Sequence, residues 1–158
     1  MIEVYTDGAC KGNPGPGGWA WAVSPDGEPR GFGGERQSTN QRMEIKAAHE
    51  AMRSFPGELT IVSDSTYVIN CFQKKWYVNW QRNGWKNASK QPVANQDLWK
   101  PMVELYDPKL HTFRWVKGHS GNRMNDLVDL LAVAASNGPF DDVPSRPTSV
   151  AETPTTLF

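Results

Sequence analysis

The 158-residue sequence contains only two cysteines, Cys10 and Cys71, which are far apart and form no C-x-x-C pair. Their scarcity argues against a disulfide framework or a zinc ribbon and favours a reducing, cytoplasmic location. The sequence also lacks a run of ~18 apolar residues and shows no signal peptide, so it predicts no membrane span and no secretion. It has no excess of either charge, because 17 Lys and Arg balance 17 Asp and Glu. Only the distribution of charge can therefore point to a nucleic-acid partner.

The pattern that is present alternates strands with helices and is typical of a single α/β domain. We expect strands over 2–6, 19–24, 30–36, 59–63 and 112–117, and helices over 40–55, from about 65 to 72, over 96–105 and over 123–136. Asn40 is the expected N-cap of the first helix. The glycine-rich stretch 8–18 predicts a loop, and 74–95 predicts an irregular insert. The domain should span 1–136, followed by a Pro-, Ser- and Thr-rich disordered tail over 137–158.

Two aspartates lie where predicted strands end. Asp7 comes where the first strand meets the glycine-rich stretch, and Asp64 follows strand 59–63. Open α/β sheets bind their ligands beyond the carboxyl ends of strands, so both are candidate site residues. A turn or helix-capping role is the alternative for each.

Two further acids occupy unusual places on predicted helices. Glu44 shares a helix face with Ala47, Ala48 and Ala51, a small-residue stripe suited to close packing on a sheet. Asp129 is the only polar residue of the run LVDLLAVAA over 127–135. A helix that is apolar nearly all round should be buried nearly all round, so we expect Asp129 to be partly enclosed. A structural ion pair is the alternative.

If these four acids converge, they cannot all be ionised without cations. A ligand set made only of oxygens selects a hard cation, magnesium or manganese, over zinc. Two such ions ~3.5–4 Å apart form the usual centre for phosphodiester hydrolysis. The spacing of the acids along the chain leaves their convergence open.

Five segments, in this order, resemble type 1 ribonuclease H: YTDGACKGNPGPGGWA (5–20), TNQRMEIKAA (39–48), VSDSTYV (62–68), a Trp-rich insert and WVKGHSGNRMNDLVDLLA (115–132). The resemblance covers 1–136. It implies an α/β ribonuclease H-like fold: a five-stranded mixed sheet with central parallel strands, flanked by helices and carrying a basic Trp-rich handle over about 74–95. It also implies an endonuclease that hydrolyses the RNA strand of RNA–DNA hybrids and leaves 5′-phosphate and 3′-hydroxyl ends.

The same resemblance implies roles for individual residues. It makes Asp7, Glu44, Asp64 and Asp129 the ligands of two Mg²⁺ ions, with Mn²⁺ a possible substitute, and makes His119 an aid to proton transfer and product release. Contacts to the RNA strand would come from Cys10, Asn13, Asn40 and the glycine-rich backbone, which would read 2′-hydroxyls. Two positions depart from the common pattern: Gln41 stands where many members have Asn, and Thr66 where Gln is common.

The insert is basic and aromatic. Between Lys74 and Lys100 there are six basic residues and one acid, together with four of the seven tryptophans. The alternatives are a small satellite core and a surface that holds nucleic acid by charge and aromatic contact. The resemblance favours a handle that grips the DNA strand. Its candidate contacts are Thr39, Trp76, Asn79, Trp80, Arg82, Trp85, Lys86 and Lys90.

Other functions are disfavoured by specific features. The G-x-G-x-x-A pattern at 15–20 precedes a predicted strand instead of a helix, and no G-K-[ST] follows, so we expect no nucleotide cofactor. An integrase-like DNA nuclease shares the fold but lacks the handle and the 2′-hydroxyl-reading segment. A non-catalytic hybrid-binding module gains nothing from four carboxylates facing a polyanion. We expect a monomer whose partner is an RNA–DNA hybrid.

Overall fold

The computed structural model describes residues 1–140. A single mixed sheet has the strand order β3-β2-β1-β4-β5. The strands β3, β2 and β1 are antiparallel, and β1, β4 and β5 are parallel. The strands are β1 (Ile2–Cys10), β2 (Gly15–Val23), β3 (Arg30–Ser38), β4 (Leu59–Ser63) and β5 (His111–Trp115). The helices are α1 (Asn40–Ser54), α2 (Thr66–Gln73), α3 (Trp76–Arg82), α4 (Gln96–Leu105) and α5 (Arg123–Ala135).

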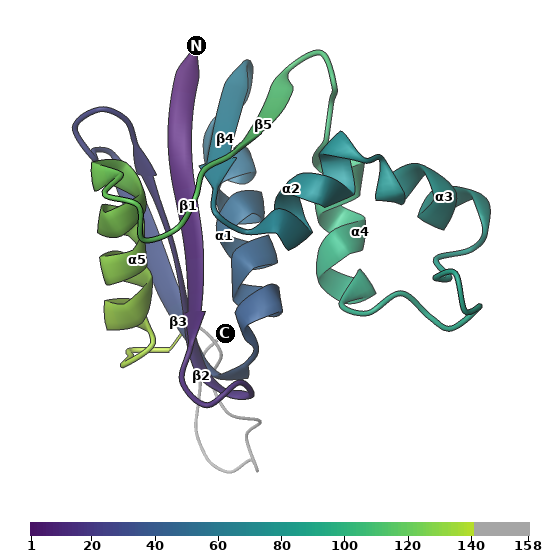
Figure 1. Cartoon of the computed structure of the whole chain (residues 1–158), viewed down its shortest axis with the longest axis horizontal. Coiled ribbons are helices and arrows are strands. Elements are labelled where there is room, and N and C mark those ends of the chain that lie inside the picture. Colours follow the sequence, from purple (N-terminus) through teal and green to yellow (C-terminus); the bar gives the residue numbers. More distant parts are fainter. Residues whose placement is uncertain (141–158) are drawn as a thin grey trace, which may run out of the picture.

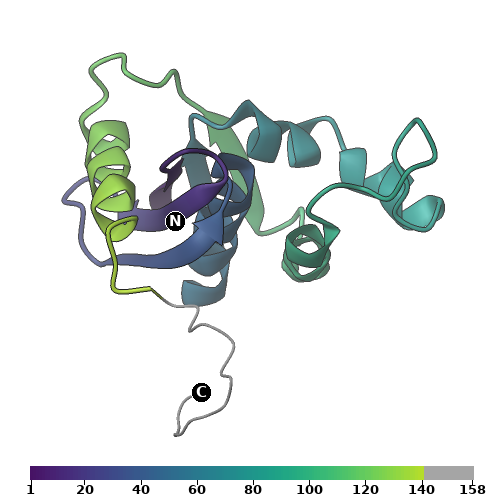
Figure 2. The same cartoon turned by 90° about the horizontal axis from the view of Figure 1, so that it is seen from below.

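Helices cover both faces of the sheet, with α5 on one side and α1 and α2 on the other, while α4 packs against α1 (Figures 1 and 2). The side chains of β1 contribute to two hydrophobic cores, one on each face of the sheet, because successive side chains of a strand point to opposite faces. Val4 is fully buried in the larger core with α1, α2 and α4, whereas Tyr5 belongs to the smaller core under α5. The expected α/β class and five-stranded mixed sheet are therefore confirmed.

The glycine-rich stretch is not the long loop that we predicted over 8–18. β1 continues to Cys10 and β2 begins at Gly15, so only residues 11–14 connect them. Gly12, with a φ of 78°, turns the chain in this connection, whereas Gly8 and Gly18 serve helix packing. A Cβ at Gly8 would lie 2.5 Å from the backbone nitrogen of Glu44 in α1, and a Cβ at Gly18 would lie 2.0 Å from the Ala132 carbonyl oxygen in α5. Both helices therefore lie directly on bare backbone.

The start of α1 also differs from the prediction. Thr39, not Asn40, is the N-cap, and its Oγ1 accepts a hydrogen bond from the Arg42 backbone N–H at 3.2 Å. Asn40 is the first helical residue, and its backbone N–H donates to Asn13 Oδ1 at 2.9 Å. The β1–β2 connection thus fixes the helix that carries Glu44.

The predicted irregular insert contains a short helix, α3, that the sequence pattern did not reveal. α3 has only seven residues, and its aromatic side chains Trp76, Tyr77 and Trp80 are half-buried against the larger core. It is therefore too short for its apolar residues to show a helical period. The handle, residues 74–95, leaves the domain at Lys75 (φ 57°) and returns at Asn95 (φ 62°), both in the left-handed region. It projects away from the sheet (Figure 1). Aromatic contacts hold it, with ring centroids of Trp80 and Trp99 5.6 Å apart.

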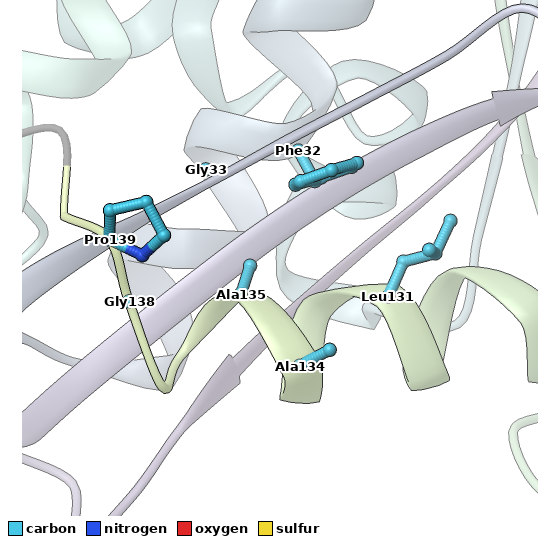
Figure 3. A pocket seen from close by; sticks show the side chains of 7 residues that line it. All are labelled: Phe32, Gly33, Leu131, Ala134, Ala135, Gly138 and Pro139. Carbon is cyan, nitrogen blue, oxygen red and sulfur yellow. The ribbon is translucent and has the colours of Figure 1, made fainter.

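The last helix is less enclosed than we predicted from its apolar run. Leu130 is 67% exposed and Val133 45% exposed. A hollow of about 330 Å³ lies between this helix and β3. The described residues that line it carry no charge: Phe32, Gly33, Leu131, Ala134, Ala135, Gly138 and Pro139 (Figure 3). The run is thus apolar on an exposed face as well as on the buried one. Within residues 1–140, no helix is long and apolar enough to cross a membrane.

Residues 137–140 contact the domain. The Lys11 ammonium group donates a hydrogen bond to the Asn137 side chain, and the Arg36 guanidinium lies 5.2 Å from the centre of the Phe140 ring. The rest of the predicted disordered tail, 141–158, lies outside the described residues.

Candidate active site

Three of the four predicted acids meet at one point. Asp7, Glu44 and Asp64 each offer a carboxylate oxygen, and these oxygens all lie within 4.8 Å of one another. Asp64 follows β4 as predicted, but Asp7 lies inside β1, opposite Ala20, and not at the end of the strand. The pairing of β1 with β4 ends at Tyr5 and Val62, two residues before Asp7. The sheet is therefore open beside Asp7, which lets side chains approach it from both helical layers.

Gly8 places Glu44 in this group. Its bare backbone allows the first turns of α1 to lie against β1, because any side chain there would collide with the backbone of Met43 and Glu44. Ala47, Ala48 and Ala51 of the predicted small-residue stripe are fully buried. The close approach of α1 to the sheet thus brings the Glu44 carboxylate to Asp7.

Three neighbours fix Asp64. The Trp115 indole N–H donates to its backbone carbonyl at 3.1 Å, and the Asn125 amide donates to Oδ2 at 3.4 Å. Gly118 approaches the same carboxylate so closely that a Cβ there would lie 2.7 Å from Oδ2. Asp64 is thereby held from β5, from the loop after it and from α5.

Asp129 joins the group through Asp7. It lies on α5, partly buried, and its charge and a hydrogen bond between the two carboxyls both raise the pKa of Asp7, after burial and the charge of Asp64. Its oxygens are not among the three that meet within 4.8 Å. Asp129 therefore borders the site from the opposite helical layer to Glu44.

The carboxyl groups are strongly perturbed. Burial, followed by the charges of Asp64 and Asp129, raises the pKa of Asp7 from 3.8 to about 8. Burial and the charges of Asp7 and Asp64 raise the pKa of Glu44 well above its usual value. Glu44 Oε1 is buried and has no hydrogen-bond partner within residues 1–140. A buried carboxylate oxygen without a donor is costly, so this oxygen set fits a hard divalent cation.

His119 lies in the loop between β5 and α5, next to Gly118, which touches Asp64. Its side chain is exposed and its φ is 54°. The loop thus brings an imidazole to the border of the carboxylate group.

The predicted RNA-strand contacts gather around the N-terminus of α1. Asn40 and Gln41 are exposed there, and Asn13 is joined to Asn40 by the hydrogen bond described above. Cys10 is half-buried, and its single S–H can donate to the backbone carbonyl of Ser38 at 3.3 Å or to that of Gly15 at 3.4 Å. Its thiol thus braces the end of the β1–β2 hairpin. Thr66, the other departure from the family pattern, is exposed at the start of α2.

The handle brings five of its predicted contacts to one hollow. A cavity of about 510 Å³ is lined by Trp76, Asn79, Trp80, Arg82, Asn83, Lys86, Asn87 and Ala88. Trp85 lies elsewhere, against α4, with the Lys100 ammonium 5.6 Å from its ring centre. Lys90 and Thr39 do not line the hollow either. The tryptophans therefore fit both interpretations of the insert, a small satellite core and a surface for nucleic acid. Trp80 packs against Trp85 and Trp99 and also faces the hollow.

Two residues that contact the candidate ligand Asp64, Trp115 and Asn125, are not among the predicted site residues. Trp115 lies in the motif over 115–132, which does not distinguish it from its neighbours. Asn125 had a usable signal, because it precedes Asp129 by four residues and so shares its helix face. A buried amide one turn before a buried acid indicates a polar site on that face.

Comparisons with known proteins agree with this fold. The family model described as RNase H matches residues 1–137. A ribonuclease H of Syntrophomonas wolfei is 52% identical over 136 residues, which cover 83% of this chain and 92% of that protein. A ribonuclease H of Nitratidesulfovibrio vulgaris is 48% identical over 139 residues, which cover 86% and 89%. The crystal structure of LC9-RNase H1, a type 1 RNase H, superimposes with a TM-score of 0.72 at 30% identity and covers 86% of this chain and 72% of that one.

Proposed function

Because this chain belongs to the RNase H family and is a ribonuclease H, we propose that it hydrolyses the RNA strand of RNA–DNA hybrids with two Mg²⁺ ions held by Asp7, Glu44, Asp64 and Asp129. The observation that supports the cations is the group of three residues whose carboxylate oxygens lie within 4.8 Å of one another, one of which, Glu44, has a buried Oε1 without a hydrogen-bond partner within residues 1–140. Mn²⁺ fits the same oxygen ligands.

When bound, such ions activate the attacking water and stabilise the leaving oxygen. The protein's own contribution is to hold the ligands in place before the substrate arrives. Asp7 lies between the acids of both helical layers and can serve both cations. Glu44 and Asp64 approach it from α1 and from the end of β4, and Asp129 approaches it from α5.

His119 is proposed to move a proton during the reaction and to assist product release. An imidazole suits proton transfer near neutral pH. The position of His119 supports this role, since the neighbouring Gly118 packs on the Asp64 carboxylate. Hydrolysis by this route would leave 5′-phosphate and 3′-hydroxyl ends.

Choice of the RNA strand is proposed to come from the exposed and half-buried residues around the start of α1. Asn13, Asn40, Gln41 and Cys10 lie where 2′-hydroxyl groups could be read, and these groups distinguish RNA from DNA. The DNA strand is proposed to lie along the handle, where Arg82 and Lys86 line the hollow beside Trp76 and Trp80. Charge and aromatic contact there would hold phosphates and sugars.

The protein is proposed to act as a monomer in the cytoplasm. All four acids come from one chain, so no second copy is needed to complete the site. Both cysteines are free, which suits a reducing compartment.

The decisive experiment incubates the protein with labelled RNA–DNA hybrid, duplex DNA and duplex RNA, each with and without magnesium. We expect magnesium-dependent cleavage of the hybrid's RNA strand alone. Asp7→Asn should abolish cleavage while keeping or strengthening hybrid binding, because it removes a negative charge that faces phosphate. Full activity of that variant would overturn the ligand assignment. Cleavage of duplex DNA would favour an integrase-like nuclease, and binding without cleavage a hybrid-binding module.

A further inference from the structure

Asn125 is the most deeply buried amide beside the carboxylate group. It is 2% exposed and lies in the first turn of α5, one helical turn before Asp129. Residues four apart on a helix share a face. α5 therefore presents an amide and a carboxyl to the site together.

The two polar atoms of this amide are used differently. Nδ2 donates to Asp64 Oδ2 at 3.4 Å, a long hydrogen bond. Oδ1 is buried and has no partner within residues 1–140. An unsatisfied buried acceptor costs about 1–3 kcal/mol, so packing alone would favour an apolar side chain here.

Helix capping does not explain the amide. Asn122 is the N-cap of α5, and its Oδ1 already accepts from the Asn125 backbone N–H at 2.9 Å. The Asn125 side chain is thus free of that task. Its two features, a donor on Asp64 and a buried acceptor at the same place, both point to the site.

We propose that Asn125 is a positioning residue for the cation site: its amide N–H orients Asp64, and its free Oδ1 accepts a hydrogen bond from water brought in with the cation. The proposal rests on the proposed function. Groups that orient metal ligands in this way typically change metal affinity or activity by about 10- to 100-fold when they are mutated. Asn125 would not touch the substrate or the cation itself.

The test measures cation binding without substrate. The dissociation constant for Mn²⁺ is determined by calorimetry, with the rise in Tm that Mn²⁺ produces, for the wild-type protein and Asn125→Ala. We expect the dissociation constant of the variant to be about tenfold higher. With hybrid present, its kcat/KM should fall at low magnesium and recover substantially at high magnesium.

A second variant and a control separate positioning from stability. Asn125→Leu fills the space with an apolar side chain, so it should keep the metal-free Tm at or above that of Asn125→Ala yet bind Mn²⁺ as weakly. Ser136→Ala alters a buried polar residue at the other end of α5 and should leave Mn²⁺ binding unchanged. Mn²⁺ binding by Asn125→Ala within twofold of wild type, with only Tm lowered, would overturn the inference while leaving the proposed function intact. If the wild-type protein itself neither bound Mn²⁺ nor cleaved hybrid, both would fall.

Discussion

Arg42 and Asp97 form a two-point ion pair that ties the first turn of α1 to the first turn of α4. Arg42 Nη1 donates to Asp97 Oδ1 at 2.9 Å and Nη2 donates to Oδ2 at 2.7 Å. Nη1 also donates to Asn95 Oδ1 at 3.3 Å. The hydrogen bond from Arg42 keeps the pKa of Asp97 below its usual value. Because Asn95 ends the handle, this contact connects the handle to the helix that carries Glu44.

Asp97→Ala should therefore weaken hybrid binding more than catalysis. The pair is largely exposed, so its loss is worth roughly 0.2–1 kcal/mol, which corresponds to a rise in KM of up to about fivefold with kcat little changed. Steady-state kinetics on labelled hybrid would check this. Glu50→Ala provides the control, since it breaks another ion pair of α1, Glu50 with Arg53, far from the handle. A fall in kcat alone for Asp97→Ala would contradict the handle connection.

The pH dependence of cation binding should follow Asp7. Its pKa in the folded protein is about 8, against an ordinary 3.8, so below pH 8 a cation must displace a proton. Because the pKa of Glu44 is raised as well, we expect the affinity for Mg²⁺ to rise by at least about tenfold per pH unit up to pH 8. Calorimetry in buffers of different ionisation enthalpy would count the released protons. Asp126→Asn, an exposed acid of α5, should keep this profile, and an affinity independent of pH between 6 and 8 would refute it.

The same shift predicts how the metal-free protein responds to pH. A carboxyl whose folded pKa is raised contributes stability that is complete below pH 3.8 and is lost as pH rises through 8. Asp7→Asn cannot ionise, so at pH 9 without cations it should have the higher Tm, by at least ~2 °C if the gain exceeds 1 kcal/mol. Thermal unfolding in EDTA measures this. An equal or lower Tm for the variant at pH 9 would show that Asp7 is not the destabilising charge.

Gly8→Ala should disrupt the site more than it destabilises the fold. The new Cβ would press on the backbone of α1, so the helix must shift and carry Glu44 away from Asp7. Overpacking of this kind costs roughly 1–3 kcal/mol. Ile61→Val, which trims a fully buried residue of β4, loses a comparable ~0.5–1.5 kcal/mol without moving α1. At a temperature where both variants are folded, only Gly8→Ala should lose Mn²⁺ affinity. Equal affinities of the two variants would show that the close packing of α1 on Gly8 does not position Glu44.

Lys75→Gly should stabilise the protein. Lys75 has φ 57°, a conformation that costs a side-chain-bearing residue about 1–2 kcal/mol, and glycine avoids most of this cost. Neighbouring Lys74 has φ −92°, so Lys74→Gly removes the same charge and should destabilise by up to ~1 kcal/mol. Chemical denaturation would measure both. Equal effects of the two substitutions would show that the left-handed backbone at 75 carries no strain.

Lys86 and Lys90 should contribute unequally to hybrid binding. Lys86 lines the hollow of the handle, whereas Lys90 is exposed outside it. Lys86→Ala should raise KM and reduce the slope of log affinity against log salt by about 0.9, the value of one lost phosphate contact. Lys90→Ala is the matched comparison and should change the slope less. If Lys90 proved the more important of the two, the hollow would not be where the DNA strand is held.

The strands and the main helices could be predicted from hydrophobic alternation and helical spacing, and the family resemblance is confirmed. The acids at unusual places could be recognised as candidates, but their spacing left open whether Asp7, Glu44 and Asp64 meet, and only the family resemblance implied it. The extent of β1 could not be predicted, because glycines that admit a helix look like glycines that turn a chain. The short helix α3 has only seven residues, too few to show a helical period. The interpretation of residues 127–135 was wrong about burial, since composition does not tell which apolar side chains face solvent.

The acids of the site come from the first strand, two middle segments and the last helix, so they are dispersed in the unfolded chain. An unfolded chain then has no special affinity for divalent cations, and any cation that binds the folded site must favour the folded state by mass action. Proteases attack transiently opened protein. The magnesium concentration of its surroundings should therefore set how long each molecule survives, as well as how fast it works.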